Sequence, residues 1–438
     1  MNLANSNSQQ APGPEGVVSI NVEPASLKTL RDLQARYGNV VEFEAPGDRR
    51  GMFINDPACV RRLLVRHHPK YRKGRGFERV EMLLGNGLIV SDGDVWRRSR
   101  TMIQPAFSRQ NVHQLEALMI DCTKHKLAAW QSVAAAGEVL NVTQEMSDFA
   151  LELILRAIFS DDYETRILSG GENPFAFLSQ DATRDLSVVL KLRQLRELLL
   201  DIIASRRAGH ASNSYDFLSM YLTAVDKQGQ AFSDRELLDE LMTLIVAGYE
   251  TSAGTLNWAW YLLAHHPEAA DKLQAEAAAY GTAFEGAADD PALTGLNWSQ
   301  QVLDETLRLY PPVWLFSRRS LESDEIEGYA IPANADVYLS PFILQRSSEF
   351  WSDPDSFKPE RFGPDGPYQK GDRPFFPFSL GPRRCLGEYF SFLEMKIHLG
   401  MLSQQFRLLP VTEQHPGLDL GINLRSLSDI QLKPELRH

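Results

Sequence analysis

The feature that most constrains the fold is one uninterrupted helical run, which begins near Ser233 and stops at His266. Ser233 and Glu236 stand in the Ser-x-x-Glu spacing of a capping box, which is typical of a helix start. Pro267 ends the run, because the residue before a proline avoids the helical conformation. At 1.5 Å per residue the helix is about 45–50 Å long, enough to cross a whole domain. Its middle is apolar nearly all round, so we expect it to be buried.

The rest of the chain is mostly helical in pattern, with a few candidate strands. Residues from about 108 to 208 show no convincing strand, and Asp56 is placed to cap a short helix. Strands are expected in a hairpin at the start of the chain, in a second hairpin-like region and weakly near the end: Val40–Glu44 with Gly51–Ile54, Ile326–Ser340, and Leu418–Leu432. We therefore expect a mainly α fold with small β lobes. Residues 17–438 would form a single domain, and residues 1–16 a disordered polar tail.

Composition excludes several classes of function. The 438 residues are 43% hydrophobic and 23% charged, as in an ordinary globular protein. A net charge of −12 argues against a nucleic acid or an anionic membrane as partner. The first 16 residues lack the pattern of a signal peptide, and no apolar run is long enough for a membrane anchor. The three cysteines, Cys59, Cys122 and Cys385, form neither a disulfide framework nor a zinc motif, so we expect a cytoplasmic protein.

Cys385 stands in the most informative local motif. The stretch from Phe378 to Gly387 reads FSLGPRRCLG, in which a Gly-Pro pair predicts a tight turn and a helix begins just past the cysteine. Free backbone N–H groups, the positive end of the helix dipole, and Arg383 and Arg384 all favour thiolate over thiol. A thiolate held by backbone donors beside Phe378 is what a haem iron needs as an axial ligand. A buried structural cysteine is the alternative, but it leaves the other motifs unexplained.

These residues resemble the cysteine-ligand signature, FxxGxRxCxG, of the cytochrome P450 family of haem-thiolate monooxygenases. The resemblance implies the P450 fold, a haem b cofactor and iron ligation by Cys385. It further implies that Phe378 and Gly387 belong to the haem-binding loop. With no membrane anchor predicted, the chain looks like a soluble member of the bacterial type.

A second motif lies within the long helix and matches the small-Gly-x-acid-Thr element of the family. It comprises Ala247, Gly248, Glu250 and Thr251, with Tyr249 where many relatives carry histidine. The glycine weakens the helix, and a threonine hydroxyl can divert a hydrogen bond from the backbone ladder, which would open a groove for dioxygen and water. The resemblance implies that Thr251 and Glu250 deliver protons to dioxygen. An ordinary core helix with a solvated glutamate is the alternative.

The resemblance also implies a structural triad. Glu305 and Arg308 are one turn apart on a helix, so they share a face and can pair. Residues 359–362 read PERF, and Arg361 would supply the third member. In isolation a surface salt bridge would be the preferred interpretation. Within the family pattern, the triad would hold the cysteine loop in place.

Haem propionates require cationic or N–H donors. Trp96 and Arg100 form a WxxxR pattern, which places both side chains on one helical face. The resemblance assigns propionate contacts to these two residues, to Arg383 and to Arg318. Arg319 is an alternative to Arg318, because a register slip of one residue exchanges them.

The substrate pocket is the least determined part of the site. By resemblance it would be lined by mostly apolar residues: Leu244, Val313, Trp314, Leu315 and Phe316, with segments around 77–88 and 427. Such a lining favours a hydrophobic small molecule. The segment 317–336 is reminiscent of fatty-acid hydroxylases of the family, whereas a terpenoid or polyketide is an equal alternative.

Together these motifs predict a monooxygenase that inserts one oxygen atom from O2 into a C–H or C=C bond. Electrons from NAD(P)H would arrive through a reductase and a separate ferredoxin or flavodoxin. That donor would dock on a basic patch on the cysteine side of the molecule, formed by outward-facing residues: Arg97, Arg98, Arg109, Arg384 and Lys396. Scattered solvated cations are the alternative to a patch.

Two rival functions remain open. A peroxide-driven haem hydroxylase would dispense with the acid–alcohol pair, whereas this chain keeps Glu250 and Thr251. A non-catalytic haem sensor or electron carrier would not need the groove predicted at Gly248 and Thr251. Neither substrate nor position of oxidation follows from the sequence.

Overall fold

The computed structural model describes residues 8–171, 173–180, 186–210, 215–280, 295–367 and 374–437. These residues form two compact units, each assembled from three stretches of the chain. A β-rich unit takes Met1–Val80, Glu305–Cys385 and Leu418–Arg425, and a helical unit takes Glu81–Asp304, Leu386–Gly417 and Ser426–His438. Because the stretches alternate along the chain, no single cut separates the units. The single domain over 17–438 stays a prediction.

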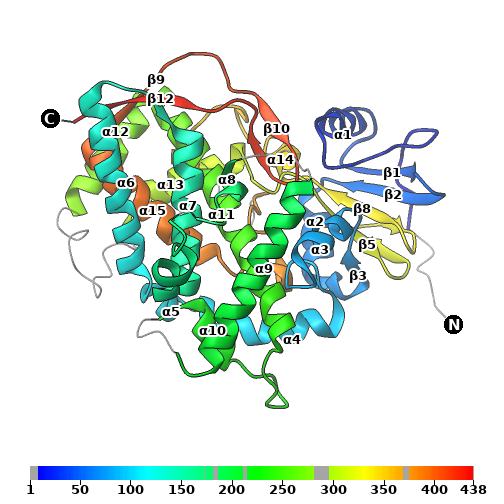
Figure 1. The fold of residues 1–438 in the computed structure, drawn as a ribbon. Helices are drawn as coiled ribbons and strands as arrows, with labels where there is room; N and C mark the ends of the chain where they lie inside the picture. The colour runs from blue at the N-terminus through cyan, green and yellow to red at the C-terminus, as the bar shows by residue number, and fades with distance from the viewer. Residues whose placement is uncertain are drawn as a thin grey trace. The chain divides into compact units, whose positions relative to one another are not determined.

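The β-rich unit is built on a five-stranded sheet with the order β1-β2-β8-β5-β3 (Figure 1). Its strands and helices are β1 Val40–Ala45, β2 Arg49–Ile54, β3 Tyr71–Lys73, β5 Phe316–Ser320, β6 Asp324–Ile326, β7 Tyr329–Ile331, β8 Asp336–Leu339, β10 Leu418–Leu420, α1 Pro24–Tyr37, α2 Pro57–Arg61 and α14 Pro341–Leu344. Strands β2 and β8 pair in parallel, and the other neighbours in this sheet are antiparallel. One face packs on a core that includes Met52, Leu63, Val337 and Leu339.

The first hairpin and the helix after it are confirmed. Val40 pairs with Ile54 and Ala45 with Arg49, so the turn lies at residues 46–48. The Asp56 carboxylate accepts the Cys59 N–H at 2.9 Å and caps α2. The chain then widens into a π-helical turn, η1 (Arg62–Arg66), and tightens into a 3₁₀ turn, η2 (His68–Lys70).

Two sequence expectations for the β-rich unit are wrong in part. Residues 326–340 do not form one hairpin: β6 pairs with β7, whereas β8 joins the large sheet between β2 and β5. The tail is ordered where it is described, because Gln9 exchanges backbone hydrogen bonds with Gly328 and Ala330, and the Pro12 carbonyl accepts from Glu42 N–H. A polar composition had predicted disorder, but backbone groups beside a strand edge find partners whatever their side chains. Residues 1–7 lie outside the described part.

The helical unit holds the longer helices. They are α4 Gly93–Ile103, α5 Arg109–His113, α6 Glu116–Ala136, α7 Val142–Phe159, α8 Phe177–Gln180, α9 Leu186–Arg207, α10 Phe217–Thr223, α11 Asp234–His265, α12 Pro267–Tyr280 and α15 Glu388–Gln405. Strands β9 (Phe406–Pro410), β12 (Gln431–Leu436) and β4 (Leu140–Asn141) form a small sheet, so the predicted helical stretch 108–208 contains one short strand. Three elements contain residues of both units: helices α3 (Phe77–Leu84) and α13 (Asn297–Leu309), and strand β11 (Leu424–Ser426). Strand β10 pairs with β11, as the alternation near the end predicted.

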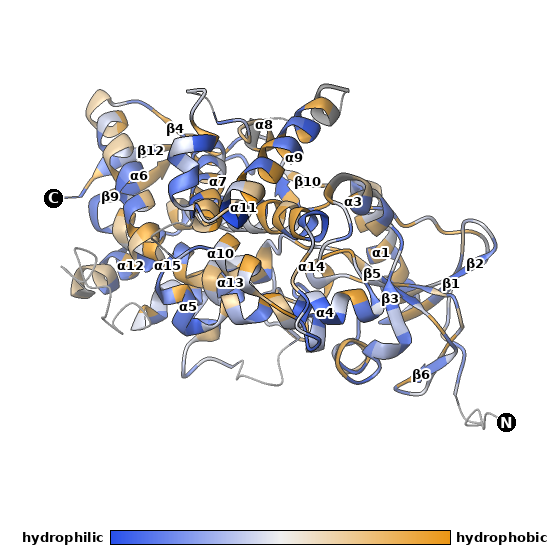
Figure 2. Cartoon of the chain, turned by 60° about the horizontal axis from the view of Figure 1, so that its bottom comes forward, coloured by the Kyte–Doolittle hydropathy of each residue, from blue (hydrophilic) through white to orange (hydrophobic). Residues whose placement is uncertain are grey.

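Helix α11 confirms the prediction with which the sequence analysis began. It spans 32 residues, and both hydrogen bonds of the Ser233–Glu236 capping box are present. Its neighbours include α7 and α9 (Figure 1), and hydrophobic and hydrophilic residues mix along these helices (Figure 2). Leu241, Leu256 and Trp258 are fully buried. Among the described helices, none combines the length and apolar composition that a membrane span requires.

Candidate active site

The cysteine loop belongs to the β-rich unit. Its turn is η8 (Gly381–Arg383), and the Cys385 N–H donates to the Phe378 carbonyl at 2.9 Å. Ser379 has a φ of 62° and Gly381 a φ of 70°, so two residues in left-handed conformations shape the loop. A Cβ on Gly381 would lie 2.2 Å from the Leu64 carbonyl oxygen in η1. The loop is therefore seated directly on the π-helical turn, and glycine is required there.

Cys385 is the exposed cysteine of the three. Cys59 and Cys122 are buried, and burial raises the pKa of both thiols, that of Cys122 to about 12. Those two are inert structural thiols. Helix α15 begins at Glu388 with Gly387 as its N-cap, so the predicted helix start just past the cysteine is confirmed.

The predicted triad is brought together in the β-rich unit. Arg308 donates Nε and Nη2 to the two oxygens of Glu305 at 2.7 and 2.8 Å, and Arg361 Nε reaches Glu305 Oε1 at 3.2 Å. Glu305 and Arg308 are fully buried, and Arg361 is 4% exposed. The remaining donors of Arg308 reach three backbone carbonyls, so the charges are paired and their hydrogen bonds satisfied. A surface salt bridge is excluded.

Sequence reasoning missed Gln345, which connects the triad helix to the cysteine loop. Its side-chain amide donates to the Leu307 and Arg308 carbonyls at 3.0 and 3.3 Å, and its oxygen accepts the Phe376 N–H at 3.2 Å. The Phe376 carbonyl in turn accepts the Ser379 N–H at 3.0 Å. Gln345 is fully buried. A lone glutamine in a loop gives no sequence signal for such a role.

The structure separates the two adjacent arginines of β5. Arg319 pairs with the buried carboxylate of Asp336 at 2.7 Å. Arg318 lies on the opposite face of the strand, where its guanidinium donates to the Ser317 carbonyl and stacks over Phe316. The assignment of Arg318 to a haem propionate stays a prediction.

Trp96 and Arg100 lie on α4 in the helical unit. Trp96 is buried, and Arg100 is half-buried with its Nε 3.3 Å from Gln104 Oε1. Their outward neighbours are paired with carboxylates: Arg97 with Asp94, and Arg98 with both Asp226 and Glu236.

The acid–alcohol segment keeps its α-helical form. The Thr251 hydroxyl donates to the Ala247 carbonyl at 2.8 Å, and the groove expected here stays a prediction. Glycine at 248 has a packing reason as well, because a Cβ there would lie 2.8 Å from Ile154 Cγ1 on α7. The Tyr249 hydroxyl donates to the Leu178 carbonyl at 2.7 Å and so links α11 to α8.

A buried acid next to this segment was missed by sequence reasoning. The Ser252 hydroxyl donates to Glu394 on α15, and Glu394 is 2% exposed. Burial raises the pKa of Glu394 to about 8, partly offset by the Ser252 hydrogen bond. One turn further, burial lowers the pKa of His398 to about 3, and Trp260 donates to its Nε2 at 3.2 Å. Both groups are thus held neutral near pH 7.

The predicted pocket residues divide between the units. Leu244 belongs to the helical unit, and the other four, residues 313–316, belong to the β-rich unit. Trp314 is fully buried with its indole N–H on the Gly421 carbonyl at 2.9 Å, whereas Val313 is 37% exposed. Because the pocket requires both units, its lining stays a prediction.

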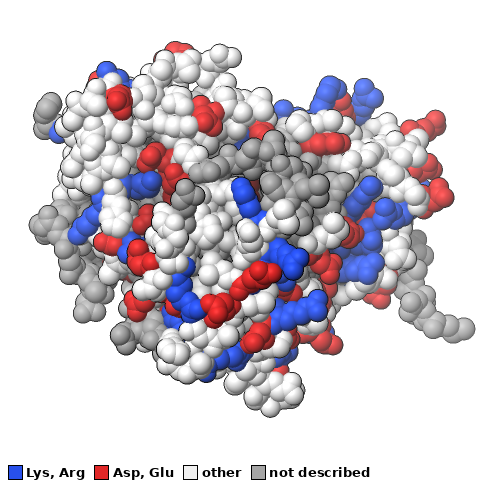
Figure 3. Space-filling view, viewed as in Figure 1, with Lys and Arg blue, Asp and Glu red and all other residues white. Residues whose placement is uncertain are grey.

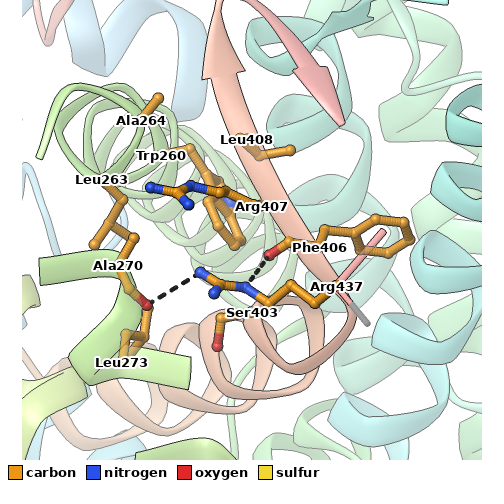
Figure 4. A pocket seen from close by; sticks show the side chains of 10 residues that line it. All are labelled: Trp260, Leu263, Ala264, Ala270, Leu273, Ser403, Phe406, Arg407, Leu408 and Arg437. Carbon is orange, nitrogen blue, oxygen red and sulfur yellow. Dashed lines mark hydrogen bonds between the residues drawn. The ribbon is translucent and has the colours of Figure 1, made fainter. Parts of the chain in front are cut away.

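Two further cavities are each formed within one unit, and none of the predicted pocket residues lines them. In the helical unit, Arg437 covers a cavity of about 10 Å³ and donates to the Phe406 and Ala270 carbonyls at 3.2 and 3.4 Å (Figure 4). In the β-rich unit, a polar recess of about 480 Å³ lies between α1 and residues 343–349. The small cavity is lined by residues of α11, α12, α15 and β9 together with Arg437.

The residues present fit a haem with a thiolate ligand. Cys385 would supply the sulfur, and Arg318, Arg383, Arg100 and Trp96 would supply donors of the kind that propionates bind. No group of three or more His, Cys, Asp or Glu side chains among the described residues could hold a metal ion by itself. These donors stand in two units, so which of them meet around one cofactor stays a prediction.

Comparison with known proteins places the chain in a family. The family model described as Cytochrome P450 matches residues 17–170 and 172–428. Cyclooctatin synthase of Streptomyces melanosporofaciens is 31% identical over 88% of this chain and 86% of its own length. Pentalenene oxygenase of Streptomyces avermitilis is 29% identical over 80% of each chain. In fold, the chain is similar to the haem domain of cytochrome P450DA, with a TM-score of 0.83 at 23% identity over 96% of this chain and 97% of that one. The chain therefore belongs to the cytochrome P450 family and is a P450 monooxygenase.

Proposed function

We propose that this P450 oxidises a terpenoid by inserting one atom of O2 into a C–H or C=C bond. The observation that carries the proposal is the set of relatives near 30% identity, which includes a pentalenene oxygenase and a cyclooctat-9-en-7-ol 5-monooxygenase. The apolar residues expected around the substrate are consistent with such a ligand. A fatty acid, suggested by residues 317–336, and a polyketide are the competing substrate classes.

A haem held by Cys385 would supply the oxidising chemistry when it is bound. The protein's own residues have separate tasks. Cys385 would ligate the iron, and Arg318, Arg383, Arg100 and Trp96 would anchor the propionates. Thr251 and Glu250 would hold and move the protons that O–O cleavage consumes. The buried triad of Glu305, Arg308 and Arg361 would keep the cysteine loop in position.

Ligand-induced changes in the haem absorption spectrum test the substrate class. A panel of terpenoid hydrocarbons and alcohols, medium-chain fatty acids and macrolactones is titrated into the holoenzyme. We expect the largest low-spin to high-spin shifts and the lowest Kd values among the terpenoids. Tighter binding of fatty acids than of every terpenoid would overturn the assignment of substrate class and leave the family assignment intact.

Thr251→Ala tests the proton-delivery role. We expect NAD(P)H consumption to continue, whereas the fraction that appears as product falls by about tenfold or more and peroxide rises. Thr123→Ala is a matched control, because the Thr123 hydroxyl makes the same 2.8 Å bond to a carbonyl four residues earlier, on α6. Wild-type coupling in Thr251→Ala would remove Thr251 from the proton path.

The electron donor is proposed to be a separate ferredoxin or flavodoxin with its reductase, but the predicted basic patch needs correction. Arg98 is paired with two carboxylates, and burial lowers the pKa of Lys396. Arg109 and Arg384 are exposed, and cationic and anionic side chains are interspersed on the face that Figure 3 shows. Charge reversal at Arg109 or Arg384 is expected to slow reduction at low salt and to leave ligand binding unchanged. Reversal of both without effect on reduction would exclude these two arginines as the docking site.

A further inference from the structure

Two adjacent carboxylates near the start of α11 hold the loop between α3 and α4. Asp239 accepts the Asn86 N–H at 3.0 Å, and Glu240 accepts the Leu88 N–H at 2.9 Å. Both residues are buried, at 8% and 3% exposure. The loop Gly85–Leu88 is thus held through its backbone by charges from a different element, separated from it by some 150 residues of chain.

The loop sequence is adapted to this close approach. A Cβ at Gly85 would lie 2.1 Å from Asp239 Oδ1, and Gly85 has a φ of +83°. A Cβ at Gly87 would lie 2.3 Å from Thr243 Oγ1 and 2.6 Å from the Asp239 carbonyl oxygen. Side chains at either position would push the loop away from α11. The two glycines therefore allow the loop to approach the acidic pair closely.

The same two carboxylates also bind two helices. Glu240 accepts a side-chain hydrogen bond from Ser99, a buried residue of α4 that lies between Trp96 and Arg100. Asp239 Oδ1 pairs with Arg196 of α9 at 3.0 Å. The pair thus connects the loop, α4 and α9 at one point on α11.

We infer that Asp239 and Glu240 are positioning residues, which fix the loop Gly85–Leu88 and the adjoining helix α4 and thereby set how bulky ligands bind. The inference rests on the proposed function, since α4 carries the residues expected to contact the haem. Neither carboxylate is assigned to contact substrate or cofactor. Both act through the backbone of the loop and through Ser99.

The charge environment agrees with this arrangement. Burial raises the pKa of Glu240 to about 7, the Leu88 N–H and Ser99 oppose the rise, and the charges of Asp239 and Glu236 add to it. Tyr221 of α10 interacts electrostatically with Glu240, and Arg196 of α9 is the cation paired with Asp239. The ionised carboxylate is the stronger acceptor for the Leu88 N–H. The loop contact should therefore strengthen as the pH rises through about 7.

Hydrogen exchange measures the loop directly and does not depend on the substrate. In Glu240→Ala holoenzyme, amides in residues 85–91 should exchange about tenfold faster, because the Leu88 N–H loses its acceptor. Glu276→Ala is a matched control: Glu276 accepts the N–H groups of Trp298 and Ser299 in the same unit, so exchange should rise at 297–302 and not at 85–91. Unchanged exchange at 85–91 in Glu240→Ala would overturn the inference.

Binding of two iron ligands of different size measures the consequence. We expect Glu240→Ala to raise the Kd of 4-phenylimidazole about tenfold and that of imidazole less than about twofold, because only the larger ligand depends on the surrounding loop. Gly87→Ala should raise the Kd of 4-phenylimidazole in the same way without a change of charge. Glu240→Gln should keep the affinity for 4-phenylimidazole and lose the pH dependence of that affinity near 7. Equal effects on both ligands, or faster exchange with unchanged binding, would refute the positioning role. Absence of any haem spectrum in the wild type would instead refute the proposed function.

Discussion

The two units of this P450 bury glutamates in different ways. In the β-rich unit, Glu305 lies between two arginines and the Lys358 N–H, so a buried negative charge faces buried positive ones. In the helical unit, Glu394 has the Ser252 hydroxyl as its partner and a pKa raised to about 8. A desolvated carboxyl stays ionised beside a cation and takes up a proton without one. The triad near the cysteine loop is thus a set of ion pairs, whereas the helix that carries Thr251 packs beside a neutral acid.

The largest loss of stability is expected from removing Glu305, the glutamate that is paired with arginines. Glu305→Ala would leave Arg308 and Arg361 buried with no carboxylate, which should cost about 3–5 kcal/mol of unfolding free energy. Urea unfolding measures this loss, and the absorption spectrum of the reduced carbon-monoxide complex reports whether the iron keeps a thiolate ligand. A loss below about 1 kcal/mol would show that the triad behaves as a surface pair, contrary to its burial.

An intermediate effect is expected at the neutral glutamate, and it depends on pH. Because the pKa of Glu394 is raised from 4.5 to about 8 in the folded state, its stabilising contribution is complete below about pH 4.5 and is lost as the pH rises through about 8. Between these values, this group alone should lower the unfolding free energy by about 1.4 kcal/mol per pH unit. Urea unfolding of wild type and Glu394→Gln from pH 5 to 8 should show this slope in the wild type alone. Identical slopes would mean that Glu394 is ionised in the folded protein.

The smallest effect is expected from the hydroxyl that accompanies the neutral acid. Ser252→Ala removes one hydrogen bond from a buried carboxyl and should cost about 1 kcal/mol. Since that bond lowers the pKa of Glu394 in the folded state, its loss should extend the pH-dependent decline in stability to higher pH at its upper end. A decline that moves to lower pH would contradict the assigned partner. Ser132→Ala on α6 is the control, because its hydroxyl lies on an exposed helix face.

Several elements of this fold could be predicted from local sequence rules. The capping box of α11, the Asp56 cap, the β1–β2 hairpin and the helix after Cys385 all depend on residues close together in sequence, and all are present. The prediction of disorder from polar composition is wrong at residues 9–12. This segment is ordered by the edge of a sheet formed much later in the chain.

Some residues of the candidate site could be predicted from the sequence and others could not, again because sequence rules are local. Glu305, Arg308 and Arg361 were identified because their motifs are specific, and the structure brings them together. Gln345, Ser252 and Glu394 were missed, since an isolated glutamine, serine or glutamate has no characteristic spacing. Their roles follow from burial, which depends on elements distant in sequence.

The sequence by itself determined the family and the order of the motifs along the chain, because these depend on residue types at short fixed spacings, and it predicts Cys385 as the sulfur donor. Only the tertiary structure decided which charges are paired. It placed Arg319 on Asp336 and Arg98 on two carboxylates. It also brought Asp239 and Glu240 to the backbone of a loop 150 residues away. The charge state and the partner of a side chain are set by its surroundings in space, and these surroundings come from segments that sequence spacing does not relate.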